Sequence, residues 1–145
     1  MKKMINVEDF MSLSEEHRER LRDITDFTAQ EKFFGVYESG ETILYVDGCE
    51  ELEYMSIDYK NKTGIYTVVC DGEKCKIYPC YTIGDMIELL ESNDITYVIE
   101  PHCTKSKEIW VEHTPSGKKY NTGLIPELCD ALLEAIKWCL DEGLI

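Results

Sequence analysis

The C-terminal segment, residues 126–143, constrains the fold more than any other part of the sequence. Its polar residues recur every three or four positions, so they form one stripe along a helix. These polar residues are Glu127, Asp130, Glu134, Lys137 and Asp141. Nearly all the others are apolar, and Pro126 and Gly143 suit the first turn and the end of a helix. A helix this apolar has to be covered, so we expect it to lie buried across the face of a sheet.

Two further helices are predicted upstream. Ser12 and Glu15 have the spacing of a capping box, with Ser14 as a competing cap, and helix formers without Gly or Pro continue to about Gln30. A short turn at 7–11 precedes this helix, whose apolar stripe is thin and indicates a position on the surface. The stripe consists of Leu13, Leu21, Ile24 and Phe27. A middle helix begins near Thr82, and its inward residues are predicted to be Ile83, Met86, Ile87 and Leu90.

The rest of the chain is predicted to form strands joined by short turns, which permit only antiparallel neighbours. The predicted strands span 33–37, 42–46, 51–59, 65–70, 74–78, 95–99, 108–113 and 118–121. Their Tyr, Val, Ile and Thr content suits a half-buried pleated surface. The sequence therefore predicts one α+β domain over residues 1–145. We expect an antiparallel sheet meander with an N-terminal surface helix, a middle helix and a buried C-terminal helix.

The net charge excludes several classes of partner. The chain has 29 Asp and Glu against 15 Lys and Arg, a formal charge of −14. Each quarter of the chain is net negative, so the acidity belongs to a folded surface and not to a tail. Direct binding to duplex nucleic acid or to an anionic membrane needs a basic footprint and is not expected. With no apolar run of membrane-spanning length and no signal peptide, we expect a cytoplasmic protein.

The seven cysteines are odd in number and include no Cys-x-x-Cys pair. Such cysteines in a chain without a signal peptide are typical of reduced thiols. Cys70, Cys75 and Cys80 are five residues apart, so on extended strands they alternate between faces and do not supply the close pair of most zinc sites. With His102, Cys103 and His113 downstream, zinc stays an alternative. We expect small core hydrophobes instead, with no metal and no cofactor.

Motifs for catalysis are absent from the sequence. No Gly-x-Gly-x-x-Gly, His-Glu-x-x-His or Gly-x-Ser-x-Gly occurs, and Gly117-Lys118-Lys119 lacks the rest of a Walker A loop. A thiol nucleophile at Cys103 with His113 as its base is the remaining enzymatic hypothesis. We therefore expect a protein that is not an enzyme.

Two charged patches are candidate binding sites. The first, here called the acidic edge, is a candidate docking surface for a basic protein, although a solvated turn has the same composition. It consists of Asp47, Glu50, Glu51, Glu53 and Asp58. The second, here called the lysine–tryptophan hairpin, concentrates lysines beside an aromatic residue and is a candidate site for an anion such as a nucleotide. It consists of Lys105, Lys107, Trp110, Lys118, Lys119 and Tyr120.

The helical segments 82–90 and 127–137 resemble helices in small uncharacterised proteins encoded by phages and prophages of Gram-positive bacteria. The segments read Thr-Ile-Gly-Asp-Met-Ile-Glu-Leu-Leu and Glu-Leu-Cys-Asp-Ala-Leu-Leu-Glu-Ala-Ile-Lys. The resemblance covers about twenty of the 145 residues. It implies a bacterial host cell and a short accessory gene whose product acts by binding host components.

Three functions are consistent with these features. The first is an acidic phage-type accessory protein that occupies a basic surface of a host protein, as a counter-defence inhibitor or regulator and with possible mimicry of nucleic acid. The second is a protein that binds or sequesters a small nucleotide-like anion at the lysine–tryptophan hairpin. The third is a small assembly or structural protein that forms homo-oligomers through its first helix.

Overall fold

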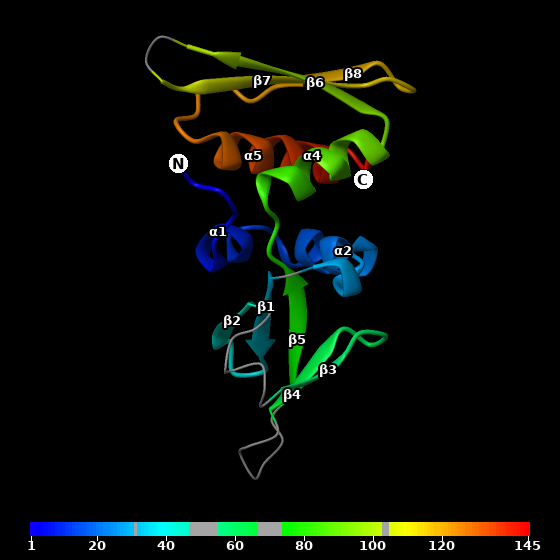
Figure 1. Cartoon of the computed structure of the whole chain (residues 1–145). Helices are drawn as coiled ribbons and strands as arrows, with labels where there is room; N and C mark the ends of the chain where they lie inside the picture. Colours follow the sequence, from blue (N-terminus) through cyan, green and yellow to red (C-terminus); the bar gives the residue numbers. More distant parts are fainter. Residues whose placement is uncertain (31, 47–54, 67–73, 103–104) are drawn as a thin grey trace. The chain divides into compact units, whose positions relative to one another are not determined.

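The computed structural model describes residues 1–30, 32–46, 55–66, 74–102 and 105–145 (Figure 1). These residues divide into two compact units, one formed by Met1–Ile5 with Tyr81–Ile145 and the other by Asn6–Cys80. Each unit combines helices with an antiparallel sheet, so the predicted α+β class is confirmed. The single domain over residues 1–145 stays a prediction. The two units are described in turn.

The unit Asn6–Cys80 carries its helices before its strands. The helices are α1 (Val7–Met11), α2 (Glu15–Ile24) and the 3-10 turn η1 (Phe27–Ala29). The strands are β1 (Lys32–Tyr37), β2 (Thr42–Val46), β3 (Met55–Asp58), β4 (Thr63–Tyr66) and β5 (Lys74–Pro79). They form a sheet in the order β2-β1-β5-β4-β3, with every neighbour antiparallel. At the centre of this sheet β1 pairs with β5, although β2, β3 and β4 lie between them in the sequence.

The predicted N-terminal helix corresponds to α2, which is shorter than the sequence predicts. A separate short helix, α1, precedes it. Residues 7–11, predicted as a turn, form helix α1. Helix α2 begins after Ser14, whose side chain accepts a hydrogen bond from the His17 amide, and ends at Ile24 instead of Gln30. It ends there because Thr25 is extended and donates its hydroxyl to the Leu21 carbonyl at 2.6 Å. Asp26 then caps η1.

Reciprocal caps join α2 to the turn between β3 and β4. The Arg22 guanidinium donates to the carbonyl oxygens of Asn61 at 2.9 Å, Lys62 at 2.8 Å and Ile77 at 3.1 Å. In return the Lys62 ammonium donates to the carbonyls of Arg22 and Asp23, both at 2.6 Å. These carbonyls at the end of the helix have no partners within it. The side chains of Arg22 and Lys62 therefore provide hydrogen-bond donors for these backbone carbonyl oxygens.

Aromatic rings fill much of the interior of this unit. Phe10 lies 5.9 Å from Phe34 and 5.5 Å from Tyr78 between ring centroids, and Phe27 meets Phe33 edge-on at 6.1 Å. All five rings are almost fully buried. Helix α2 contributes Leu21 to this interior, while its residue Ile24 is more than a third exposed. This limited burial fits the thin apolar stripe of the helix.

The unit Met1–Ile5 with Tyr81–Ile145 is a three-stranded sheet with two helices on one face (Figure 1). Its helices are α4 (Ile83–Ser92) and α5 (Leu128–Asp141). Its strands are β6 (Ile95–Pro101), β7 (Lys107–His113) and β8 (Lys118–Asn121). The sheet order β6-β7-β8 is a meander. Helix α5 packs against β7, β8 and α4, while α4 also contacts β6.

Helix α5 is buried on the sheet, as the sequence predicts. Its buried side chains are Cys129, Ala131, Leu132, Leu133, Ala135, Ile136, Cys139 and Leu140. It begins two residues after Pro126, with Glu127 at the cap position and no side-chain capping bond. The Glu127 carboxylate instead accepts a hydrogen bond from the Lys2 amide at 3.2 Å. Gly143 ends the helix at φ +68°, a backbone conformation that suits glycine.

Helix α4 has the predicted cap. Thr82 Oγ1 accepts from the Asp85 amide at 3.1 Å, and Asp85 accepts from the Thr82 amide at 2.8 Å. Met86 and Leu90 are fully buried, whereas Ile83 and Ile87 are only partly covered. Four cysteines are buried core residues, as predicted: Cys75, Cys80, Cys129 and Cys139.

The substitution Arg22→Lys is expected to lower the free energy of unfolding by about 1–3 kcal/mol. Lysine keeps the positive charge, but its single ammonium group cannot reproduce the planar guanidinium that donates to the three carbonyl oxygens. Urea unfolding followed by circular dichroism measures the loss. Arg20→Lys is the matched control, since Arg20 lies on the same helix and is exposed; an equal loss in both variants would contradict the capping role.

The Cys139 thiol is expected to resist alkylation in the folded protein at pH 8. Burial raises the pKa of this thiol to about 12. In the unfolded chain this thiol ionises near pH 9, whereas in the folded chain it stays protonated to higher pH. Its contribution to the free energy of unfolding is therefore fully present below pH 9 and is lost as pH rises toward 12. Iodoacetamide labelling with peptide mass mapping tests this. A Lys137→Cys variant, at an exposed position of the same helix, should react; rapid native labelling of Cys139 would refute the prediction.

Candidate binding face of the three-stranded sheet

The β6–β8 sheet has one covered and one open face. Side chains of a strand alternate between faces, and the register fixes which residues lie side by side. On the face toward α5, Ile95, Ile109 and Val111 are buried. The opposite face, here called the outer face, consists of Thr96, Val98, Glu100, Glu108, Trp110, Glu112, Lys119 and Asn121.

The centre of the outer face is apolar and exposed. Val98 of β6 pairs with Trp110 of β7, and Trp110 pairs with Asn121 of β8. Trp110 is 48% exposed and Val98 is 57% exposed, which is unusual for large apolar side chains at the centre of a strand. A shallow groove of about 220 Å³ lies over them, with Glu112 and Lys119 also in its lining. A half-exposed Trp in a shallow groove is typical of an anchor for a binding partner.

Carboxylates flank this apolar centre on both sides. On one side Glu112 of β7 pairs with Lys119 of β8, and on the other Glu100 of β6 pairs with Glu108 of β7. Glu108 accepts from the Asn121 amide at 2.5 Å and is joined to His102 at 2.8 Å. These hydrogen bonds, the one from Asn121 first, lower the pKa of Glu108, so it is a carboxylate at neutral pH. The outer face therefore presents an aromatic ring between negative charges.

The structure divides the lysine–tryptophan hairpin between the two faces. Trp110 and Lys119 share the outer face, while Lys118 and Tyr120 alternate to the other side. Lys118 forms an ion pair of 3.0 Å with Glu142 beyond α5. The other two lysines lie at the turn into β7, where Lys107 donates to the carbonyl of Lys105 at 3.2 Å. Of the six residues, Trp110 and Lys119 line the groove over Val98.

Tyr120 is part of the packing under the sheet. Its ring stacks on Trp138 of α5 with centroids 5.2 Å apart and an interplanar angle of 5°. Its hydroxyl donates to Glu134 at 3.2 Å. Burial, together with the Glu134 carboxylate, raises the pKa of Tyr120. This tyrosine therefore holds β8 on α5 and does not face a ligand on the outer face.

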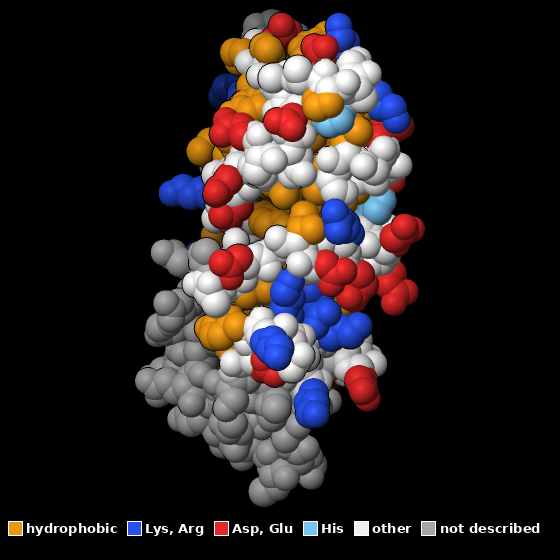
Figure 2. All heavy atoms as spheres, turned by 90° about the vertical axis from the view of Figure 1, so that its right-hand side faces the viewer, with side chains coloured by type: hydrophobic (Ala, Val, Ile, Leu, Met, Phe, Trp, Pro, Cys, Tyr) orange, Lys and Arg blue, Asp and Glu red, His pale blue; other side chains and the backbone are white. Residues whose placement is uncertain are grey.

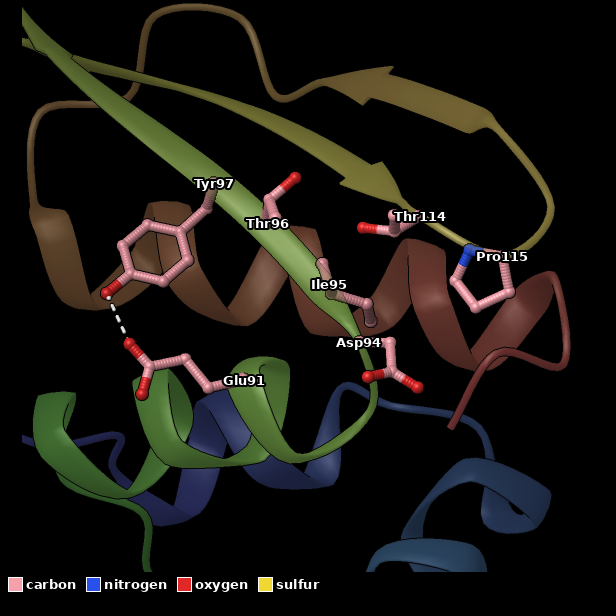
Figure 3. Close-up of a pocket in the computed structure, with 7 residues that line it drawn as sticks. All are labelled: Glu91, Asp94, Ile95, Thr96, Tyr97, Thr114 and Pro115. Carbon is pink, nitrogen blue, oxygen red and sulfur yellow. Dashed lines mark hydrogen bonds between the residues drawn. The ribbon is translucent and has the colours of Figure 1, made fainter.

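A second groove of about 770 Å³ opens at the end of α4 (Figure 3). Its lining comprises Glu91, Asp94, Ile95, Thr96, Tyr97, Thr114 and Pro115. Tyr97 points from β6 toward α4 and donates its hydroxyl to Glu91 at 3.1 Å, whereas Thr96 points to the other side of the strand. Two carboxylates and no lysine line this groove, so it offers an anion little attraction.

The acidic edge lies outside the described residues except for Asp58. The Asp58 carboxylate accepts hydrogen bonds from the backbone and side chain of Asn61 and from the Lys60 amide, which lower its pKa. Asp58 thus stabilises its own turn. Elsewhere, acidic side chains are spread among basic and apolar ones in the view of Figure 2, as the even distribution of charge along the sequence predicts.

Sequence analysis grouped Trp110 with Lys119 but missed Val98, the neighbour of Trp110 on β6. Alternation within 108–113 places Trp110 on the same side as Glu108 and Glu112. Finding Val98 beside it requires the register of β6 on β7. The contact of His102 with Glu108 also depends on that register.

No protein-family model matches this chain, and comparisons with curated proteins and with solved structures find no similar protein. Within the described ranges, no helix is long and apolar enough to cross a membrane.

Trp110 is expected to be the tryptophan that is accessible to a collisional quencher. It is half-exposed, whereas Trp138 is stacked on Tyr120. Acrylamide quenching of the fluorescence should therefore fall strongly in Trp110→Phe and persist in Trp138→Phe. Circular dichroism of both variants verifies folding, and stronger quenching in Trp110→Phe than in Trp138→Phe would show that Trp110 is covered.

Proposed function

We propose that this chain is a binding protein whose outer face takes a Lys- or Arg-rich segment of another protein. The observation that carries the proposal is the half-exposed Trp110 between Glu112 on one side and Glu100 and Glu108 on the other. An aromatic face attracts a cationic side chain, and adjacent carboxylates add ion pairs to the same cation. Val98 extends the apolar contact for the stem of a long basic side chain.

The charge of the whole chain supports a basic partner. At −14, the protein attracts a cationic surface over a distance of about a Debye length, which raises the rate of encounter. The resemblance of the helices 82–90 and 127–137 to those of phage proteins extends the proposal to a phage-type accessory protein in the bacterial cytoplasm. There it occupies a basic surface of a host protein as an inhibitor or regulator.

A small nucleotide-like anion is the second candidate, and one observation favours it. Trp110 and Lys119 line the same groove, so a ring could stack on the indole while its phosphate meets the ammonium. The carboxylate of Glu112 in that groove opposes a phosphate, which is why the basic segment is the first choice.

Titration with an Arg-rich peptide, followed by amide chemical shifts, tests the proposal. We expect the shifted amides to cluster in β6–β8, the affinity to fall with salt, and Trp110→Ala to weaken binding about tenfold, or about 1.4 kcal/mol. Tyr59→Ala is the matched control, because Tyr59 is also 48% exposed but lies outside this sheet.

Equal affinity of Trp110→Ala and the parent protein for the peptide would refute the proposal. An acidic peptide of the same length serves as the specificity control and should not bind. If instead a nucleotide shifts the amides around Lys119 and the Arg-rich peptide does not, the second candidate is correct.

A further inference from the structure

The carboxylates of Glu100 and Glu108 and the imidazole of His102 come together at one end of the outer face. Their ligand atoms all lie within 4.8 Å of one another, and His102 Nε2 is 2.8 Å from Glu108 Oε2. These three side chains are here called the Glu–His–Glu cluster. Each residue offers one atom of a kind that binds divalent metals. The geometry points to a binding site for a first-row divalent metal ion, with zinc as its best occupant.

The register supplies an independent reason for a cation at this place. Glu100 and Glu108 are direct partners on neighbouring antiparallel strands. Like charges directly opposite each other destabilise a sheet. A divalent ion between the two carboxylates would convert this repulsion into attraction.

The residues around the cluster hold two of its members in position. The side-chain amide of Asn121 donates to Glu108 Oε1 at 2.5 Å, and its oxygen Oδ1 accepts from the backbone amide of Gly123 at 2.6 Å. The backbone of His102 is held on both sides, since its amide donates to Ser106 at 3.0 Å and its carbonyl accepts from Lys105 at 2.9 Å. Support of this kind for a ligating carboxylate is typical of metal sites.

The chemistry of the three ligands selects the class of metal. An imidazole suits zinc, cobalt and nickel and disfavours calcium and magnesium, which take oxygen ligands. Zinc bonds of about 2.0–2.2 Å require ligand atoms about 3.3–3.5 Å apart. The distance of 2.8 Å between His102 and Glu108 is close to this, and a ligand atom of the exposed Glu100 lies within 4.8 Å of both. The metal replaces the proton between His102 Nε2 and Glu108, and a fourth position stays open to water.

Calorimetric titration of the full chain with zinc, without any peptide, tests this site. We expect one equivalent to bind, and His102→Gln and Glu100→Gln each to weaken that binding at least tenfold. His113→Gln and Glu112→Gln are matched controls from the same sheet and should bind as the parent protein does. Unchanged affinity in His102→Gln, or no binding by the parent protein, would overturn the proposal.

Cobalt(II) distinguishes this cluster from the cysteines, because thiolate ligands add a charge-transfer band in the near ultraviolet. We expect d–d bands without that band in the parent protein, and loss of the d–d bands in His102→Gln. A thiolate band that survives His102→Gln would place the metal on cysteines and overturn the proposal. Because the peptide titration runs without metal, failure of the metal site and failure of the proposed function are separate results.

Discussion

Burial of α5 under β6–β8 is the interaction on which the rest of this unit depends. The helix covers one face of the sheet with side chains that include Leu132 and Ile136, both fully buried. Burying such side chains contributes about 1.5–3 kcal/mol each before the entropy of ordering is subtracted. A sheet with one covered face has to present its alternate residues on the other. The exposure of Trp110 is thus a consequence of where α5 lies.

In the other unit, two cations cap backbone groups near the end of helix α2. Helix α2 has few apolar residues and contributes only Leu21 as a fully buried side chain. Arg22 and Lys62 compensate by joining the helix to the turn after β3 through hydrogen bonds to carbonyl oxygens. Tyr78 adds a bond of 2.5 Å to Glu19. Burial alone would raise the pKa of Glu19, but this hydrogen bond and the nearby cations keep it below its ordinary value.

The outer face combines apolar and acidic side chains, because the alternation of residues along β6 and β7 places both kinds on the same side of the sheet. The exposed Trp110 and Val98 would be a liability in an isolated monomer, since an apolar patch at the centre of a sheet invites association. In the proposed function, the carboxylates around them would favour a basic partner over a second acidic copy of this chain. At the end of the same face, His102 lies beside Glu108, and in the proposed metal site its imidazole would add a nitrogen ligand to the carboxylates.

Local patterns determined much of this structure. The polar stripe of the last helix, the cap at Thr82 and the short turns identified the helices, the antiparallel strands and the α+β class, because these features depend on residues a few positions apart. Tertiary structure decided the pairing of β1 with β5, the end of α2 at Ile24 and the neighbours of Trp110. Those contacts join residues far apart in the chain, and their choice depends on which surfaces bury best together. The sequence by itself thus determined an acidic α+β chain with a Trp between two carboxylates on one strand face, and only the sheet register brought Glu100 and His102 beside Glu108.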